Sequence, residues 1–402
     1  MTSAGRYLEF RETQAVGSIV DLDADQASAI AGTGLLIVEP RGEQRWMLCP
    51  KGNMVGAVRV GDQEVVVRPK APFSSVLFML AYARDPGIAP EEFEGSTDSD
   101  LWPLLAATLE RLAGRALGGG VLQGYVERDD ELTVVRGRIR VSDQIARHQD
   151  LPLPLEVRYD EYETDIPENR ILRSALHWMS RVEGVPPVLR GGLRRLESRL
   201  AGAMLLRVGQ PRPAWSRSRL NVRYVPALCL AELILDHLGL STRRGDAPVA
   251  SFVVDMAATF ESFVAASATA GFTQILGHNR GMTHGQYRSF LDAERSQPIR
   301  PDIVHTGLDG APDAVIDAKY KLIDDHPGHG PRLSDLYQML AYCTVLELAH
   351  GTLVYAAGKG DTSAATLHIA GSDRTITCWP IDVSVPPRDL HRQVREALGA
   401  GC

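Results

Sequence analysis

Cysteines are few in this sequence, and their spacing suits neither a metal site nor a disulfide framework. The 402 residues include five cysteines, and no two of them form a Cys-x-x-Cys pair. A zinc ribbon, a cysteine-ligated iron–sulfur cluster and a disulfide-stabilised scaffold all need closely or regularly spaced cysteines. The pattern therefore argues against these three classes, and we expect buried thiols at every position except the terminal Cys402.

Long apolar segments are also absent. No apolar run reaches the roughly 18 residues that a membrane-spanning helix needs. The first residues, MTSAGRYLEFRETQ, are polar and lack the apolar core of a signal peptide. We therefore expect a cytoplasmic protein that has no contact with a membrane.

A nucleotide-binding loop is missing as well. The sequence contains no G-x-x-x-x-G-K-[ST] motif, and Gly358-Lys359-Gly360-Asp361 does not match a phosphate-binding loop. The chain is thus expected to have no nucleotide site of its own. Any step that nucleotide hydrolysis drives must come from a partner.

Positive charge is scarce for a protein that binds DNA alone. The net charge is −7, from 43 basic and 50 acidic residues, whereas a free-standing DNA-binding domain is usually basic because phosphate neutralisation supplies much of its affinity. The exception is the stretch from Arg190 to Arg223, which holds nine arginines and one acid, Glu197. This stretch is either a solvated helix face with a loop or a surface that contacts phosphates or a partner.

The order of the predicted elements indicates a mixed α/β protein. Short β-branched runs dominate up to residue 68, with a hairpin expected around Gly61-Asp62. From Asp255 onward the pattern alternates between strands and helices. Periodicity predicts helices over residues 72–84, 101–117, 168–201 (with a break at 185–187) and 225–240.

These patterns predict two domains. Residues 1–160 are expected to form a β-rich, partly helical N-terminal domain. Residues 161–402 are expected to form an α/β domain in which helices flank a mixed sheet. Within it, we expect a helical, arginine-rich lead-in over 161–250 and a core over 251–402.

Two acidic motifs in the C-terminal third carry the chemistry. The segment RPDIV, with Asp302 at its centre, predicts the start of a strand, and GLDGAP predicts a turn. The next segment, AVIDAKYK, runs from Ala314 to Lys321 and predicts a second strand. Paired as an antiparallel hairpin, the two strands would bring Asp302 close to Asp317, although 15 positions separate them in the sequence.

Strand periodicity aligns the remaining groups. Side chains alternate between the faces of a strand, so Asp317, Lys319 and Lys321 share one face. Carboxylate oxygens suit Mg²⁺, and a metal-bound water has a lowered pKa and can attack a phosphodiester. We interpret Asp302 and Asp317 as metal ligands, with the backbone carbonyl of Ala318 completing the shell. Lys319 would orient or deprotonate the water, or offset the charge that develops on the phosphorus.

Each motif by itself is weak. An Asp-x-Lys on a strand is usually a surface ion pair, and Pro-Asp is usually a turn. The combination of Pro-Asp, a gap of hairpin length, an apolar approach and Asp-Ala-Lys is far more specific. It predicts a magnesium-dependent DNA endonuclease site of the PD-(D/E)xK type.

Two helices offer further site residues. Gln338 and Tyr342 lie four positions apart on a helix that we expect Ser334 to cap, so they share one face. By themselves they would be a half-buried helix face, but Gln-x-x-x-Tyr after an Asp-x-Lys strand resembles the DNA-contacting motif of RecB-like nucleases. Glu261, the single acid of the apolar helix 256–264, is either an exposed residue or a catalytic carboxylate that reaches the metal. Gln338 is a further catalytic candidate, and the candidate DNA contacts are Gln338, Tyr342, Arg300 and Lys321.

Segments along nearly the whole chain resemble the McrC family, the nuclease subunit of the McrBC modification-dependent restriction system. The segments are VRPKAPFSSVLFMLAYA, VVRGRI, YDEYETDIPENRIL, RLNVRYVPALCLAELIL, FVVDMAATFESFV, RPDIV, VIDAKYK and DLYQMLAY. Because they occur in the same order, the set is more specific than any single motif. Asp302, Asp317 and Lys319 match the catalytic pattern of the family without departure. The loop from Asp324 to Arg332 is a candidate elaboration of this sequence's own.

The resemblance implies partners that the residues themselves do not reveal. McrC-like proteins stimulate a hexameric AAA+ GTPase, McrB, and their N-terminal half inserts into its central channel. McrB recognises the methylated cytosine. The resemblance therefore implies a GTP-dependent (type IV) restriction complex that acts on double-stranded DNA carrying modified cytosine. A contact between the McrC-like chains of two such complexes is a further candidate. A nuclease subunit with a net negative charge is compatible with such a complex, because the partner binds the DNA.

Two other functions stay open. One is a structural activator of the AAA+ GTPase that does not cleave DNA. The other is a RecB-like nuclease that processes DNA ends together with a helicase. The intact set of Asp302, Asp317 and Lys319 argues against the activator, and the colinear N-terminal half argues against the end-processing nuclease.

Overall fold

The structure is a computed structural model, and it describes most of the chain in two compact units. Unit 1 combines Met1–Thr108 with Asp236–Cys402, and unit 2 is Leu109–Leu235. This division differs from the boundary that we predict at residue 160, because segments on both sides of that residue are hydrogen-bonded to each other within unit 2. The described residues are 7–14, 16–94, 100–148, 152–207, 210–241, 249–275, 281–320, 332–358 and 363–399.

One sheet of unit 1 joins strands from distant parts of the sequence. Its order is β1 (Tyr7–Arg11), β6 (Gln63–Arg68), β5 (Met54–Val60), β11 (Val249–Asp255) and β10 (Leu238–Ser241). The predicted hairpin at Gly61-Asp62 is confirmed, because Val60 pairs with Gln63 across a two-residue turn. β11, by contrast, pairs with β5, so this strand belongs to the N-terminal sheet although it immediately precedes the C-terminal core in the sequence.

A small neighbouring sheet completes the N-terminal part of unit 1. It contains β2 (Ser18–Asp21), β4 (Arg45–Pro50) and β3 (Leu36–Gly42), in that order. Asp23 is the N-cap residue of helix α1 (Ala24–Gly32), and its side chain accepts a hydrogen bond from the Gln26 backbone N–H in a capping box. Helix α2 (Phe73–Arg84) and the short 3₁₀ helix η1 (Pro90–Glu92) follow. The N-terminal part of unit 1 is therefore β-rich and partly helical.

The C-terminal part of unit 1 holds a six-stranded mixed sheet. Its order is β12 (Met282–Gly285), β15 (Ile303–Thr306), β16 (Pro312–Lys319), β17 (His350–Ala357), β19 (Thr375–Asp382) and β18 (Ala365–His368). β16, β17 and β19 run parallel, and the outer pairs are antiparallel. A separate short pair, β13 (Ser289–Phe290) and β14 (Pro298–Ile299), precedes β15. The prediction of a mixed α/β arrangement is confirmed.

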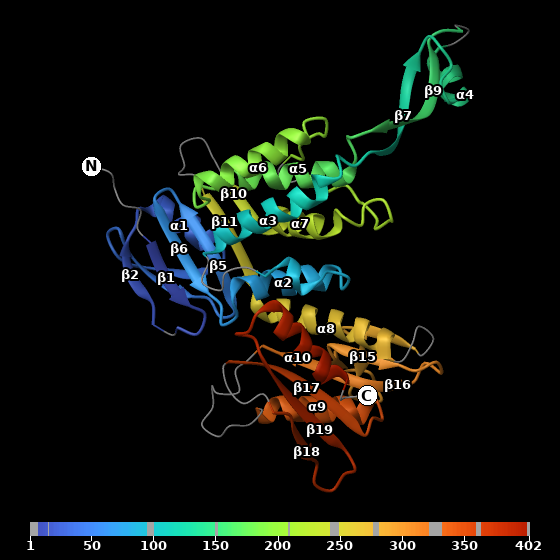
Figure 1. The fold of residues 1–402 in the computed structure, drawn as a ribbon. Helices are drawn as coiled ribbons and strands as arrows, with labels where there is room; N and C mark the ends of the chain where they lie inside the picture. The colour runs from blue at the N-terminus through green and yellow to red at the C-terminus, as the bar shows by residue number, and fades with distance from the viewer. Residues whose placement is uncertain are drawn as a thin grey trace. The chain divides into compact units, whose positions relative to one another are not determined.

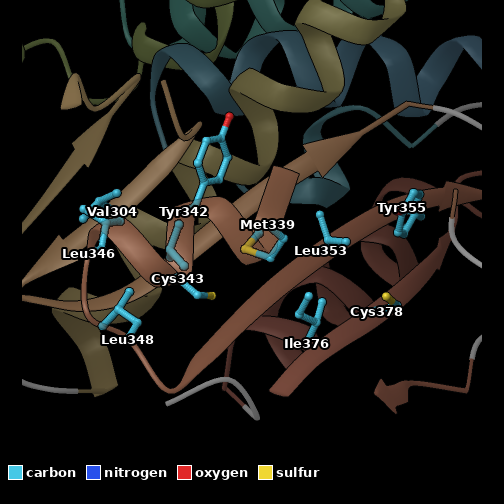
Figure 2. Packing of buried hydrophobic residues seen from close by; sticks show 11 residues of the cluster. Val304, Met339, Tyr342, Cys343, Leu346, Leu348, Leu353, Tyr355, Ile376 and Cys378 are labelled. Carbon is cyan, nitrogen blue, oxygen red and sulfur yellow. The ribbon is translucent and has the colours of Figure 1, made fainter. Parts of the chain in front are cut away.

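Helices pack on the faces of this sheet (Figure 1). On one face, α9 (Leu333–Val345) packs its buried residues against β15, β16, β17 and β19, and Figure 2 shows Met339, Tyr342 and Cys343 in this cluster. Gly351 allows the close approach of α9 to β17, since a Cβ there would lie 2.5 Å from the Met339 Sδ atom. α8 (Met256–Ile275) lies against the side of β16 that carries Tyr320, and α10 (Pro387–Gly399) packs beside α8.

A buried hydrogen bond ties the N-terminal segment to the strand that holds the candidate site. The Tyr320 hydroxyl donates to Glu12 Oε2 at 3.0 Å, and the Lys70 backbone N–H donates to the same oxygen at 3.2 Å. Both Glu12 and Tyr320 are buried. Burial raises the pKa of the Glu12 carboxyl, even though the Lys70 ammonium opposes this shift.

Removing this hydroxyl should destabilise the fold. We expect Tyr320→Phe to lower the free energy of unfolding by about 1–3 kcal/mol, because a buried carboxylate would lose one of its donors. Chemical denaturation of the two proteins measures the difference. Tyr337→Phe is the matched control, since Tyr337 is 62% exposed, and equal losses for the two variants would contradict the expectation.

Unit 2 is a group of helices with a long β-ribbon. The helices are the end of α3 (Leu101–Gly118), α4 (Val141–Arg147), α5 (Pro167–Met179), α6 (Pro187–Arg199) and α7 (Val225–His237). The predicted break at residues 185–187 is confirmed, whereas the last predicted helix ends at His237 and β10 takes the next residues. β7 (Gly124–Leu132), β9 (Leu155–Glu163) and β8 (Arg138–Ile139) form the ribbon, which carries α4 at its outer end and extends away from the other helices of its own unit (Figure 1).

The arginine-rich stretch 190–223 contributes to the structure of unit 2. Three of its members donate hydrogen bonds to backbone carbonyls: Arg199 to Leu117, Arg212 to Glu232 and Arg223 to Gly120. The bonds of Arg199 and Arg223 connect segments on both sides of residue 160. The observation favours a structural role for Arg199, Arg212 and Arg223. For the other exposed arginines of α6, the contact with phosphates or with a partner stays a prediction.

Among the described residues, no helix has both the length and the apolar character needed to cross a membrane.

Candidate active site

The two acidic motifs meet on a β-hairpin. β15 and β16 pair antiparallel, with Ile303 opposite Ile316 and Val304 opposite Val315, and this confirms the predicted hairpin. The register places Asp302 across from Asp317. The Ala318 backbone N–H donates to Asp302 Oδ2 at 2.9 Å, so the first carboxylate is held directly against the second strand.

Asp317 and Lys319 share one side of β16, as strand alternation predicts. Asp317 is 1% exposed, and Lys319 Nζ lies 2.5 Å from its Oδ2. Val315 belongs to the cluster beneath α9, so this side of the strand is the one that α9 covers. Tyr320, on the other side, has its ring 5.9 Å from that of Phe260 on α8.

The carboxylates of Asp302 and Asp317 repel each other electrostatically. Burial raises the pKa of Asp317 to about 7, and the charge of Asp302 contributes in the same direction. Burial also raises the pKa of Asp302, opposed by the Ala318 N–H and assisted by the charge of Glu261. Burial disfavours the charge on Lys319, but the carboxylates of Asp317 and Asp302 outweigh this effect and raise its pKa. The site therefore holds more negative charge than the single ammonium of Lys319 neutralises.

Glu261 reaches the same site through a residue that the sequence did not single out. The side-chain amide of Gln286 donates a hydrogen bond to Glu261 Oε1 and another, at 3.1 Å, to Asp302 Oδ1. Glu261 projects from α8 and Asp302 precedes β15. The structure thus brings Glu261 to the two strand carboxylates. No motif or periodicity marks Gln286, because it lies in a connection between two short strands.

The residues predicted on α9 lie beside the carboxylates. Gln338 Nε2 donates to the Tyr342 hydroxyl at 2.7 Å, so the two side chains share a face as predicted. Burial raises the pKa of Tyr342 to about 12, with a further contribution from the charge of Asp317. Gln338 is exposed, and its position beside a buried tyrosine allows contact with a ligand at this edge.

The start of α9 corrects one expectation. The helix begins at Leu333 and its N-cap residue is Arg332, so Ser334 lies inside the first turn and is not the cap. Asp335, in the first turn of the helix, is buried, and its Oδ2 lies 3.4 Å from the Tyr355 hydroxyl. Its charge also helps to raise the pKa of Lys319, which places it near the ammonium.

The other two candidate DNA contacts are Arg300 and Lys321. Arg300 is exposed, two positions before Asp302. Lys321 lies outside the described residues, as does the part of the loop from Asp324 to Pro331. For these residues the DNA-binding role stays a prediction.

The donor set of the site fits a hard divalent cation. Asp302, Asp317 and Glu261 supply carboxylate oxygens, the ligands that Mg²⁺ and Mn²⁺ prefer. Asp317 Oδ2 is buried, and the Lys319 ammonium lies 2.5 Å from it. One ammonium offsets only part of the charge of three carboxylates, and a divalent cation would compensate the rest.

A second carboxylate cluster, in unit 2, has a different character. Ligand atoms of Glu131, His148 and Glu156 lie within 4.8 Å of one another. The Glu156 carboxylate already accepts hydrogen bonds from Arg147 at 3.2 and 3.3 Å, and Arg140 approaches it to 3.5 Å. Two guanidinium groups therefore neutralise this cluster, and an ion-pair network accounts for it at the end of the ribbon where Glu131 pairs with Glu156, beside α4 (Figure 1).

The fold and the site together define a mixed α/β protein that carries three carboxylates and a lysine at one edge of a six-stranded sheet. The family model described as "McrBC 5-methylcytosine restriction system component" matches residues 50–356. This match covers most of the chain, and the chain belongs to that family.

Solved structures are similar in fold. One similar chain belongs to a refined half-complex from the tetradecameric assembly of Thermococcus gammatolerans McrB AAA+ hexamers with bound McrC. It aligns with a TM-score of 0.59 and 17% identity, and the alignment covers 98% of this chain and 99% of the other. A chain of the Thermococcus gammatolerans McrBC complex aligns with a TM-score of 0.41 and 16% identity, covering 66% and 88%. No curated protein matches the chain.

Proposed function

We propose that this protein is the DNA-cleaving subunit of a GTP-dependent, modification-dependent restriction complex, with an endonuclease site of the PD-(D/E)xK type. The observation that carries the proposal is the convergence of Asp302, Asp317 and Lys319 on paired strands, with Glu261 joined to Asp302 through Gln286. Membership of the McrBC family supplies the biological context.

In this proposal each residue has a distinct task. Asp302, Asp317 and Glu261 hold Mg²⁺, and the Ala318 backbone carbonyl is a further candidate ligand. A bound Mg²⁺ supplies a water of lowered pKa and stabilises the charge of the scissile phosphate. Lys319 orients the attacking water and offsets negative charge on the phosphate. Gln338, Tyr342 and Arg300 contact the DNA.

The partner in this proposal is a hexameric McrB-like AAA+ GTPase. Two observations support it: the family of the chain and the likeness in fold to a chain of an assembly of McrB hexamers with bound McrC. The partner would recognise modified cytosine in double-stranded DNA and supply the GTP hydrolysis. The net charge of −7 is compatible with a subunit that does not have to bind DNA by itself.

The β7–β9 ribbon is the candidate docking element for this partner. Its apolar side chains are unusually exposed: Tyr125 is 76% exposed and Tyr162 57%, and Val134 on the connection is 71% exposed. Exposed aromatic and apolar side chains on one element typically mark a protein–protein contact. Ion pairs such as Arg158 to Asp129, at 2.6 Å, stiffen the ribbon.

Cleavage of closed circular DNA tests the function. With the McrB-like partner, GTP and Mg²⁺, we expect methylated circular plasmid to be converted to linear product, and chelation of Mg²⁺ to stop the reaction. The product is followed by gel electrophoresis, and unmethylated plasmid is the control. GTP turnover without any cleavage would instead favour the structural activator, and cleavage restricted to linear DNA would favour the end-processing nuclease.

A further inference from the structure

The side-chain amide of Gln286 occupies the space between two carboxylates of the site. Its Nε2 group donates to Asp302 Oδ1 at 3.1 Å and to Glu261 Oε1. A glutamine amide has two N–H hydrogens, so both are used on the two acids. The neutral amide of Gln286 therefore lies between two acidic groups, at a position that would suit a cation.

The backbone at Gln286 is held to the strand that carries Asp302. The Gln286 backbone N–H donates to the Asp302 carbonyl at 2.7 Å, and the Tyr287 N–H donates to the Pro301 carbonyl at 3.0 Å. Gln286 also has a φ of 51°, a left-handed conformation that non-glycine residues adopt rarely. The amide is therefore anchored at its backbone as well as at its tip.

The two carboxylates that the amide bridges are also metal candidates. Asp302 is already fixed on its other oxygen, because the Ala318 N–H donates to Oδ2. Oδ1 faces the amide. The lone pairs of Asp302 and Glu261 that accept hydrogen bonds from Nε2 are not available to a cation at the same time, so amide and cation compete for them.

We propose that Gln286 is a placeholder in the metal site: it bridges Glu261 and Asp302 while no ion is bound, and it releases at least one of them when a divalent cation enters. The inference rests on the proposed function in one respect, namely that the cation binds at Asp302 and Glu261. The amide keeps two acids at one place in the metal-free protein, and the cost of displacing it lowers the affinity for the ion.

Removing the amide should tighten metal binding. For Gln286→Ala in the full-length chain, we expect about tenfold tighter binding of Mn²⁺, the value for one charge-assisted hydrogen bond that the ion no longer has to displace. The loss of free Mn²⁺ is followed by electron paramagnetic resonance, without DNA and without partner. The melting temperature of metal-free Gln286→Ala should be lower than that of the native chain, because the two acids then face each other without a shared donor.

A lysine at the same position should have the opposite effect. In Gln286→Lys an ammonium takes the place between Glu261 and Asp302 permanently, so we expect a higher melting temperature without metal and no Mn²⁺ binding at the site. Gln297→Ala and Gln297→Lys are the matched controls, because Gln297 is exposed in the same region. Both controls should bind Mn²⁺ like the native chain.

Asp302→Asn separates a failure of this inference from a failure of the proposed function. If Asp302→Asn abolishes Mn²⁺ binding but Gln286→Ala binds no more tightly than the native chain, or more weakly, the placeholder role is wrong and the metal site stands. If Asp302→Asn binds Mn²⁺ like the native chain, the ion lies elsewhere, and both the metal site and the placeholder role are overturned. Tighter binding by Gln286→Ala together with loss of binding by Gln286→Lys supports the proposal.

Discussion

Replacing Lys319 by alanine, or Asp317 by asparagine, is expected to reduce DNA cleavage by about a thousandfold, the upper range for removal of one group that stabilises a transition state. Stimulation of the partner's GTPase should be unchanged in both variants. The reason is that Lys319 and Asp317 lie together in one buried site, with Nζ and Oδ2 2.5 Å apart, whereas the candidate docking ribbon belongs to unit 2.

Both activities should be measured on the same assembled complex, with methylated circular plasmid and GTP. Asp313→Asn is the matched control, because Asp313 is an exposed acid on the same strand and lies outside the site. Its cleavage rate should equal that of the native protein. Cleavage that survives in both Lys319→Ala and Asp317→Asn would refute the site assignment, whatever the GTPase does.

The second large effect is expected at the ribbon. Tyr125 and Tyr162 lie opposite each other on β7 and β9, and their ring centroids are 5.0 Å apart. We expect Tyr125→Glu combined with Tyr162→Glu to weaken association with the AAA+ partner by about a hundredfold or more, since exposed aromatic residues are typical hot spots and a buried charge at the interface would be unpaired. Loss of GTPase stimulation and of cleavage should follow.

Three measurements make this prediction specific. Binding to the partner is measured by light scattering or calorimetry, GTP hydrolysis by phosphate release, and the fold by circular dichroism. Leu308→Glu is the control, because Leu308 is 80% exposed and belongs to unit 1. Native affinity in the doubly substituted ribbon would show that the partner docks elsewhere.

The two sets of variants also distinguish the competing functions. A structural activator loses its function in the ribbon variant but not in Lys319→Ala, and it never cleaves DNA. An endonuclease subunit loses cleavage in both. An end-processing nuclease loses cleavage in Lys319→Ala but requires a DNA end in every experiment.

The hairpin that carries the site was predictable because its contacts are local. Fifteen positions separate Asp302 from Asp317, and a turn, two apolar runs and strict strand alternation suffice to define their pairing. The side of β16 that Asp317 and Lys319 share follows from the same alternation. Helices over 101–117, 168–201 and 225–240 were predictable from their periodicity, and their bounds differ from those observed only at the ends and at the break.

Contacts between distant segments were not predictable in this way. β11 pairs with β5 of the N-terminal sheet, and Glu12 meets Tyr320 across 308 positions. The division into units at residues 108 and 235 also depends on such pairings. A single sequence contains patterns of local preference, whereas long-range pairing depends on which apolar faces cover one another in the folded chain.

The amino-acid sequence by itself determined the site hairpin, the side of the strand that its acidic and basic groups share and the resemblance to one family. Tertiary structure alone decided that Glu261 joins Asp302, that Gln286 stands between them and that Asp335 is buried near Lys319. The physical reason is that these groups come from α8, from a connection between strands and from α9, and only the packing of both helices against the sheet brings them to one edge. Glu261, for which the sequence left two interpretations open, completes the site together with Gln286, which no motif or periodicity marks.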